Sequence, residues 1–202
     1  VYAGYLAKKM GLPINKLIVA TNQNDILHRA ISNGGYEVEN VFETLSPSMD
    51  IQVASNFERL LYDLNEGDDL QTIDAMKNIK EKGKYIINQE KLDKINANFL
   101  SSRMSEEEVL NTIKDVYKKF NIVLDPHSAI GYGAFDKINL DGNNIVLATA
   151  HPCKFPDAIK KAIDIKADLP KELMFVMDEK ENFDIVDNDV KKIKQHIKER
   201  IQ

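Results

Sequence analysis

Three chemically capable side chains stand close together in the sequence, at Thr149, His151 and Cys153, directly after the apolar run at 145–148. We expect this run to form a buried strand over 145–150, so that these groups reach the carboxyl edge of a sheet, where open α/β sheets bind ligands. The Thr149 hydroxyl could hold a ligand or simply end the strand by bonding to backbone. A His–Cys pair with no third ligand nearby is a poor zinc site, so we predict no metal. We expect a packed or rim imidazole and an inert, buried thiol.

Two asparagines occupy an equivalent place earlier in the chain. Asn22 and Asn24 follow a short apolar stretch at 16–21, which predicts another core strand. Their amides could bind a small ligand at the sheet edge. Asn24 is better explained as the cap of a helix over 25–33, and the role of Asn22 stays open.

A third group lies in or just after a polar loop at 46–50, which is long enough to cover a site. It consists of Ser48, Asp50, Asn56 and Arg59. Arg59 could clamp a phosphate group with two parallel hydrogen bonds. An arginine early in a helix more often forms a surface ion pair, and that alternative is kept.

The elements that must position these groups alternate between helix and strand, which indicates an α/β fold. Capping boxes are predicted at Ser55–Glu58 and Ser105–Glu108, and Asp125 with Pro126 marks a further helix start. The stretch at 84–98 allows either a short strand or a broken helix. The expected helices span 1–10, 25–33, 55–64, 71–81, 105–119, 126–134, 156–165 and 189–201, with an edge strand possible at 173–177.

Composition excludes some classes of function. The net charge of −5 argues against general affinity for nucleic acid or anionic membranes, and the lysines near the C-terminus are expected to form a solvated helix face. No apolar run reaches the roughly 18 residues of a membrane span. A single cysteine suits a reducing compartment, so we expect a cytoplasmic protein. The chain begins in mid-pattern at Val1, as a piece of a longer polypeptide would.

Several segments, taken in chain order, resemble threonine synthases, and together they extend over most of the sequence. The segments are 3–14 with 17–22, 44–51, 55–61, 125–129, and 148–152 with Lys154 and Phe155. Two positions depart from the usual family pattern: Ala54 stands where proline is common, and Ser128 where threonine is common.

The resemblance implies a fold. Threonine synthases are fold-type II enzymes of pyridoxal 5'-phosphate (PLP), related to the tryptophan synthase β chain, and this chain resembles only their C-terminal part. We therefore expect 1–202 to belong to the large PLP-binding domain, with a short, mostly parallel sheet flanked by helices and helical insertions at about 60–120. The N-terminal domain, the phosphate-binding loop and the Schiff-base lysine are expected to lie outside this chain. Lys154 does not stand in the lysine's motif.

The resemblance also implies an activity. The family converts O-phospho-L-homoserine and water to L-threonine and phosphate, as a PLP-dependent carbon–oxygen lyase. The resemblance suggests Thr149 as the partner of the cofactor's ring nitrogen, and Asn22 and His151 as further cofactor-binding residues. Substrate contacts would come from Ser48, Asp50, Asn56 and Arg59. No catalytic residue is assigned, because covalent catalysis needs the absent lysine, so the segment alone should be inactive.

One alternative stays open. The chain could be a non-catalytic binding or structural module that docks with a partner chain supplying the other half. The sequence does not decide between a monomer and a homodimer.

Overall fold

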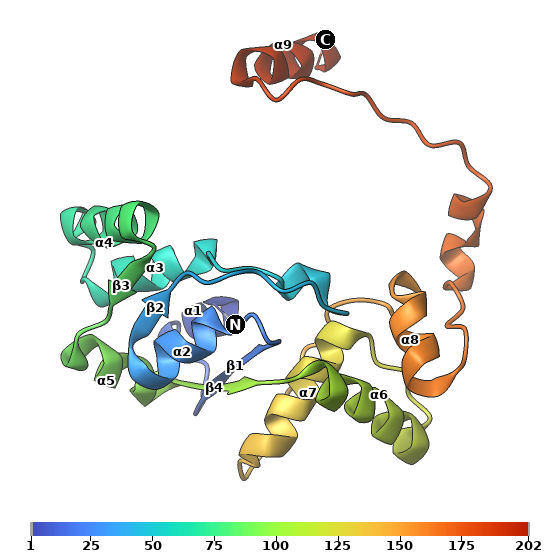
Figure 1. Cartoon of the computed structure of the whole chain (residues 1–202), viewed down its shortest axis with the longest axis horizontal. Helices are drawn as coiled ribbons and strands as arrows, with labels where there is room; N and C mark the ends of the chain where they lie inside the picture. Colours follow the sequence, from blue (N-terminus) through green and yellow to red (C-terminus); the bar gives the residue numbers. More distant parts are fainter. Residues whose placement is uncertain (1, 202) are drawn as a thin grey trace. The chain divides into compact units, whose positions relative to one another are not determined.

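The computed structural model describes residues 2–201, and the chain divides into two compact units, one ending at Ala167 and one beginning at Asp168. The first unit has the α/β character that the sequence predicts. After the helix α1 (Tyr2–Lys9), strand β1 (Leu17–Thr21) pairs in parallel with β4 (Phe99–Arg103), in a register that sets Leu17 beside Phe99 (Figure 1). Parallel pairing brings the carboxyl ends of both strands to one edge. The predicted helix start at Val1 lies outside the described residues.

Helices α2 (Ile26–Asn33) and α7 (Pro126–Ile138) each pack against both strands of the parallel pair. A second, antiparallel pair joins β2 (Gly35–Glu37) to β3 (Lys84–Ile86). Around it pack α3 (Ser55–Leu64), α4 (Asp69–Lys82) and α5 (Gln89–Asn98). Leu61 and Ile95 are fully buried there, in the larger of two hydrophobic cores.

The smaller core lies among α6 (Glu106–Phe120), α7 and α8 (Pro156–Ile163). Val109, Ile113, Ile130 and Ile159 meet there without solvent exposure. Burying an aliphatic side chain contributes roughly 1.5–3 kcal/mol, so this three-helix layer gives the N-terminus of α7 a firm support.

The helix starts predicted at Ser105 and Asp125 are confirmed. Ser105 and Glu108 form the reciprocal capping box of α6, and Asp125 caps α7 with Pro126 in its first turn. The capping box at Ser55–Glu58 is wrong, because Ala54 is the cap residue of α3 and Ser55 is already helical. A serine one position inside the helix cannot reach the amide that a cap residue reaches.

The predicted strand at 145–150 is also wrong. This stretch has no regular secondary structure, and Ile145 and Leu147 are 88 % and 64 % exposed. A strand needs a neighbour to accept its backbone hydrogen bonds, and among the described residues no strand pairs with 145–150. Thr149 therefore follows an irregular, exposed segment rather than a core strand.

The ambiguous stretch at 84–98 contains both alternatives in succession, the strand β3 and then the helix α5. The sequence did not predict β4 at all, although this strand is the parallel partner of β1. The stretch between 60 and 120 therefore holds two strands as well as helices.

The second unit contains a 3-10 helix η3 (Lys171–Met177) and the terminal helix α9 (Val190–Arg200). The edge strand predicted at 173–177 is wrong, because the segment coils into η3 with its apolar side chains exposed. Helix α9 has no buried residue, which agrees with a solvated basic face.

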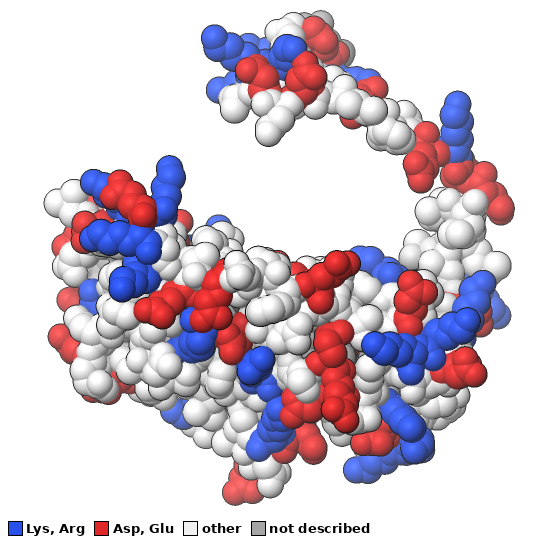
Figure 2. Space-filling model, in the orientation of Figure 1, with Lys and Arg blue, Asp and Glu red and all other residues white. Residues whose placement is uncertain are grey.

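Across the described residues, none of the helices is long and apolar enough to cross a bilayer. On the face of the first unit in Figure 2, basic and acidic groups are interspersed.

Candidate functional site

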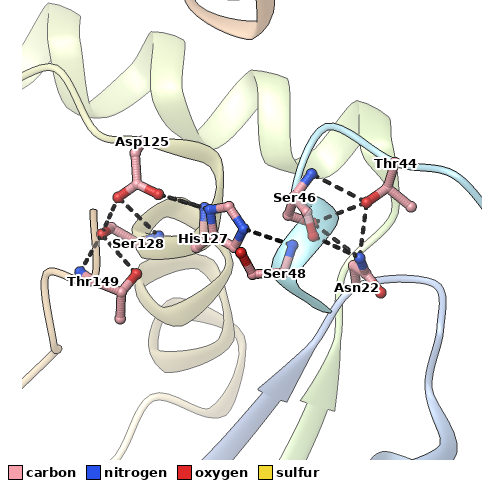
Figure 3. Close-up of polar contacts among 8 residues, drawn as sticks. All are labelled: Asn22, Thr44, Ser46, Ser48, Asp125, His127, Ser128 and Thr149. Atoms are coloured by element: carbon pink, nitrogen blue, oxygen red, sulfur yellow. Dashed lines mark hydrogen bonds and ion pairs between the residues drawn. The ribbon is translucent and has the colours of Figure 1, made fainter. Parts of the chain in front are cut away.

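Polar side chains gather where β1 ends, between α2, the loop around η1 (Pro47–Met49) and the N-terminus of α7 (Figure 3). In Figure 1 the segment that leaves β2 runs across to α7, and η1 lies at its far end. The site therefore joins parts of the chain that are distant in sequence. The segment 42–50 is called the η1 loop below.

Asn22 anchors the η1 loop and is only 1 % exposed. Its Nδ2 lies 2.8 Å from Thr44 Oγ1, 2.9 Å from Ser46 Oγ and 2.7 Å from Asp50 Oδ1. Its Oδ1 accepts from the backbone N–H of Asn24 at 2.8 Å. The amide is thus already engaged by the chain itself.

Asn24 is buried, and its side chain holds the η1 loop through hydrogen bonds to the loop's backbone. Its Oδ1 accepts from Phe42 N at 2.8 Å, and its Nδ2 donates to Phe42 O at 2.8 Å and to Asp50 Oδ1 at 2.9 Å. The prediction that Asn24 caps the following helix is wrong, since Asp25 takes the cap position of α2 and makes no side-chain cap bond.

Asp50 closes the loop on itself. Its Oδ2 accepts from Thr44 N at 2.9 Å, and its Oδ1 accepts from the Thr44 hydroxyl at 2.6 Å. Leu45 N adds a bond to Glu106 Oε2 at 3.1 Å, which ties the loop to α6. These bonds fix the loop before any ligand arrives.

Asp125 and His127 connect α7 to the loop. Asp125 is 1 % exposed, and its Oδ1 lies 2.9 Å from His127 N and 3.0 Å from His127 Nδ1. On the other side of the ring, Nε2 accepts from Ser48 N at 3.3 Å. An Nε2 that accepts carries no hydrogen, so the Nδ1 hydrogen of the neutral ring points at Asp125.

Ser128 connects the same carboxylate to Thr149. The Ser128 hydroxyl donates to Asp125 Oδ2, and Ser128 Oγ accepts from Thr149 N at 3.0 Å. The two hydroxyl oxygens of Ser128 and Thr149 are 3.4 Å apart. The bond at its backbone N–H holds Thr149 in place. Because Thr149 is exposed, its hydroxyl is still accessible.

The remaining predicted site residues lie outside this network. Asn56 and Arg59 are exposed on α3, and the Arg59 guanidinium donates to the Asn56 side chain. His151 is exposed and caps the short helix η2 (Pro152–Lys154), its Nδ1 accepting from Cys153 N at 3.3 Å. Cys153 is half-buried, so the expectation of a buried thiol is wrong.

Sequence reasoning missed the central residues of the network. The sequence predicts Asp125 only as a helix cap, places His127 at the surface or behind the ligand-contacting residues, and gives Ser128 no part in the site. Their proximity in the sequence, Asp-Pro-His-Ser, was the available signal, but nothing in it places the η1 loop opposite. Among residues 2–201, no three His, Cys, Asp or Glu side chains form a group that could hold a metal ion.

The fold and the site together define an α/β polypeptide whose polar groups meet at the carboxyl end of parallel strands, the edge at which such folds bind ligands. Comparison with known proteins gives the family. The family described as "Threonine synthase, C-terminal" matches residues 128–197. The threonine synthases of Pseudomonas aeruginosa and Saccharomyces cerevisiae are each 39 % identical, over 98 % and 100 % of this chain.

Solved structures agree. The chain resembles the structure titled PLP-bound threonine synthase from Brucella melitensis with a TM-score of 0.88 and 42 % identity, over 98 % of this chain and 43 % of that one. For the yeast threonine synthase the TM-score is 0.83 and the identity 38 %, over 99 % of this chain and 45 % of that one. The chain belongs to the threonine synthase family and corresponds to its C-terminal segment. It spans 43 % and 44 % of the lengths of the Pseudomonas and yeast relatives.

Proposed function

We propose that the whole gene product is a fold-type II threonine synthase, which converts O-phospho-L-homoserine and water to L-threonine and phosphate with PLP as cofactor. The family membership of this chain and the PLP-bound relative support the proposal. A cytoplasmic location fits the single cysteine. The segment described here would contribute one wall of the cofactor site and no catalytic lysine.

The observation that carries this assignment is the state of the Thr149 hydroxyl. Ser128 has one hydroxyl hydrogen, and that hydrogen is donated to Asp125. Ser128 therefore acts only as an acceptor toward Thr149, so Thr149 is the donor in their 3.4 Å contact. That contact is long, and the exposed Thr149 hydroxyl can turn from it toward a stronger acceptor. An exposed neutral hydroxyl whose hydrogen is held only by this long contact, and whose backbone is tethered, fits an unprotonated pyridine nitrogen.

When bound, PLP would supply an electron-withdrawing ring, which the protein tunes through the partner of the ring nitrogen. Thr149 would donate its hydroxyl hydrogen to that nitrogen. A neutral donor leaves the nitrogen without a full positive charge, and so moderates the electron withdrawal. His151, exposed two positions further on, would line the rim of the cofactor site.

The η1 loop would face the substrate. The Ser48 side chain is exposed, and only its backbone N–H is used, by His127. We propose that the Ser48 hydroxyl binds a polar group of the substrate, while Asn22 and Asp50 hold the loop in shape. Asn56 and Arg59 would reach the substrate only if their mutual bond opened, and we propose them as peripheral phosphate contacts.

The test is phosphate release from O-phospho-L-homoserine by the whole gene product purified with PLP. Thr149→Val keeps the shape of the side chain and removes the hydroxyl, and we expect it to lower kcat/KM about tenfold or more. Thr149→Ser should retain most of the activity. Thr112→Val is the matched control, because the Thr112 hydroxyl bonds to Glu108 O within α6, outside the site.

Two results would contradict the proposal. One is a wild-type protein that binds PLP but releases no phosphate from O-phospho-L-homoserine. The other is robust turnover by residues 1–202 alone, because covalent catalysis through a lysine imine requires a residue that this segment is not proposed to supply.

A further inference from the structure

We propose that Asp125 is a positioning residue that sets Thr149 and the η1 loop at the same time, through two separate arms. The catalytic part of this inference rests on the proposed function, whereas the structural part does not. Asp125 is almost fully buried and uses both carboxylate oxygens. One oxygen serves the Ser128 arm and the other serves the His127 arm (Figure 3).

The Ser128 arm works because a carboxylate can only accept hydrogen bonds. Asp125 Oδ2 takes the Ser128 hydroxyl hydrogen and also accepts from Ser128 N at 3.3 Å. The lone pairs of Ser128 Oγ then face Thr149, whose backbone N–H donates to them at 3.0 Å. Asp125 thereby fixes the backbone of Thr149. It leaves the Thr149 hydroxyl as the donor of only a long 3.4 Å contact to Ser128 Oγ, which a ligand acceptor can replace.

The His127 arm works through the imidazole ring. Asp125 Oδ1 takes the Nδ1 hydrogen, which keeps Nε2 free to accept from Ser48 N at 3.3 Å. The ring is 6 % exposed and packs against Phe155, with 4.8 Å between the ring centroids. Burial of the ring and its two polar partners leave it one orientation, so Asp125 also sets where Ser48 stands.

An ordinary aspartate cap does less than this. Asp68, at the cap of α4, accepts from Gln71 N and from the Gln71 side chain, both within its own first turn. Asp125 caps α7 in the same way, but its two arms continue beyond the helix. His127 contacts Ser48, 79 positions away in the sequence, and Ser128 contacts Thr149, 21 positions away. The carboxylate therefore couples two walls of one site.

The test compares two single-arm variants in the whole gene product without substrate. Ser128→Ala removes one arm, and we expect amide hydrogen exchange at Thr149 to quicken about tenfold while Ser48 is unchanged. His127→Phe keeps a packed ring and removes the other arm, so only Ser48 should quicken. Ser128→Thr restores the hydroxyl and should restore slow exchange at Thr149.

Asp125→Asn should quicken exchange at one of the two positions at least, because the single amide oxygen can accept from only one arm and the NH2 group faces the other. Asp68→Asn makes the same chemical change at another helix cap and should affect neither position. If Asp125→Asn fails to fold, the two single-arm variants still decide. Equal quickening of Thr149 and Ser48 in either single-arm variant, or no quickening in both, would overturn the proposal.

Kinetics then separate the two proposals. With an active wild type, Ser128→Ala should weaken PLP binding about tenfold, and Ser128→Thr should restore it. His127→Phe should mainly raise KM for O-phospho-L-homoserine, because it removes the acceptor of the Ser48 N–H and so leaves the proposed substrate contact at Ser48 less well positioned. A wild type that releases no phosphate would refute the proposed function, and the exchange measurements would still judge Asp125.

Discussion

The phenolic oxygen of Tyr36 accepts a hydrogen bond from the backbone N–H of Ala54 at 2.8 Å, and the Tyr36 ring stacks on Phe57 with centroids 4.5 Å apart. Tyr36 comes from β2, whereas Ala54 precedes the first turn of α3. One buried side chain therefore attaches the antiparallel sheet to the start of a helix that has no side-chain cap of its own.

Replacing Tyr36 by phenylalanine tests this attachment. Tyr36→Phe keeps the stacked ring but leaves the buried N–H of Ala54 without an acceptor, which should cost about 1–3 kcal/mol of stability. Denaturant unfolding followed by circular dichroism measures it. Tyr62→Phe, at an exposed position on α3, is the control and should change stability by less than about 0.5 kcal/mol. A Tyr36→Phe protein as stable as the control would contradict the attachment.

Glu108 gives a prediction about pH. The hydrogen bond from Lys137, followed by the bond from Ser105 N, lowers the pKa of Glu108 from 4.5 to about 2. A group whose pKa is depressed by folding adds stability above its ordinary pKa and loses it as pH falls toward the folded value. Stability from Glu108 should therefore be present above about pH 4.5 and disappear by pH 2.

The measurement is unfolding at a series of pH values between 2 and 5, together with an NMR titration of the Glu108 carboxyl carbon. Glu108→Gln should flatten the stability curve in this window, by a small amount because the side chain is 43 % exposed. Glu107→Gln, one position earlier and exposed, should leave the curve unchanged. An NMR midpoint at 4.5 would show that the hydrogen bonds from Lys137 and Ser105 do not lower the pKa of Glu108.

Two glycines of α7 provide a matched pair for packing. A Cβ added at Gly133 would overlap Met104 Cε and lie 3.0 Å from Thr112 Oγ1, whereas one at Gly131 would meet only Val146 Cγ1, at 3.3 Å. Met104 is 2 % exposed and has little room to move. We expect Gly133→Ala to cost about 1–3 kcal/mol. Gly131→Ala should be neutral or stabilising by about 0.5–1 kcal/mol, because alanine favours helix. Thermal unfolding of both variants decides, and equal melting temperatures would contradict the predicted overlap.

Arg29 shows where lysine cannot replace arginine. Its Nε pairs with Asp25 at 2.8 Å, its Nη1 with Glu39 at 3.0 Å, and its Nη2 donates to Glu37 O at 2.9 Å. A lysine keeps the charge but cannot bind all three in this fork. Arg29→Lys should cost about 1–2 kcal/mol, because its side chain is only 19 % exposed. Lys94→Arg, on an exposed helix face, should change little. Urea unfolding measures both, and a cost for Arg29→Lys no larger than that of Lys94→Arg would show that the fork adds no stability.

The sequence predicts best where the cause is local. The capping box of Ser105 and Glu108, and the start of α7 at Asp125, depend on residues within one helical turn, and both are confirmed. The start of α3 depends on which of two adjacent residues takes the cap, and Tyr36, distant in sequence, holds Ala54 there. That contact cannot be inferred from Ser55 and Glu58 alone.

Strands depend on partners, and this is where sequence reasoning fails. Residues 145–148 have an ideal strand composition, yet they remain unpaired and exposed. The strand β4 contains Ser101 and Ser102 and looks weak, yet it pairs with β1 over five positions. For the candidate site, the sequence places Asn22 and Thr149 at the edge of the sheet, and both belong to the polar cluster. That Asp125 links them follows only from the packing of α7 against the parallel strands.

The parallel pair of β1 and β4 has a kinetic consequence. Between these two strands the chain passes through α2, α3, α4 and α5, so pairing Leu17 with Phe99 must close a long loop. Closing such a loop costs entropy before any contact is gained, and chains dominated by distant contacts reach the native state slowly. We therefore expect the helices to appear early during refolding, and Asn22 to find its loop only in the last, slow phase.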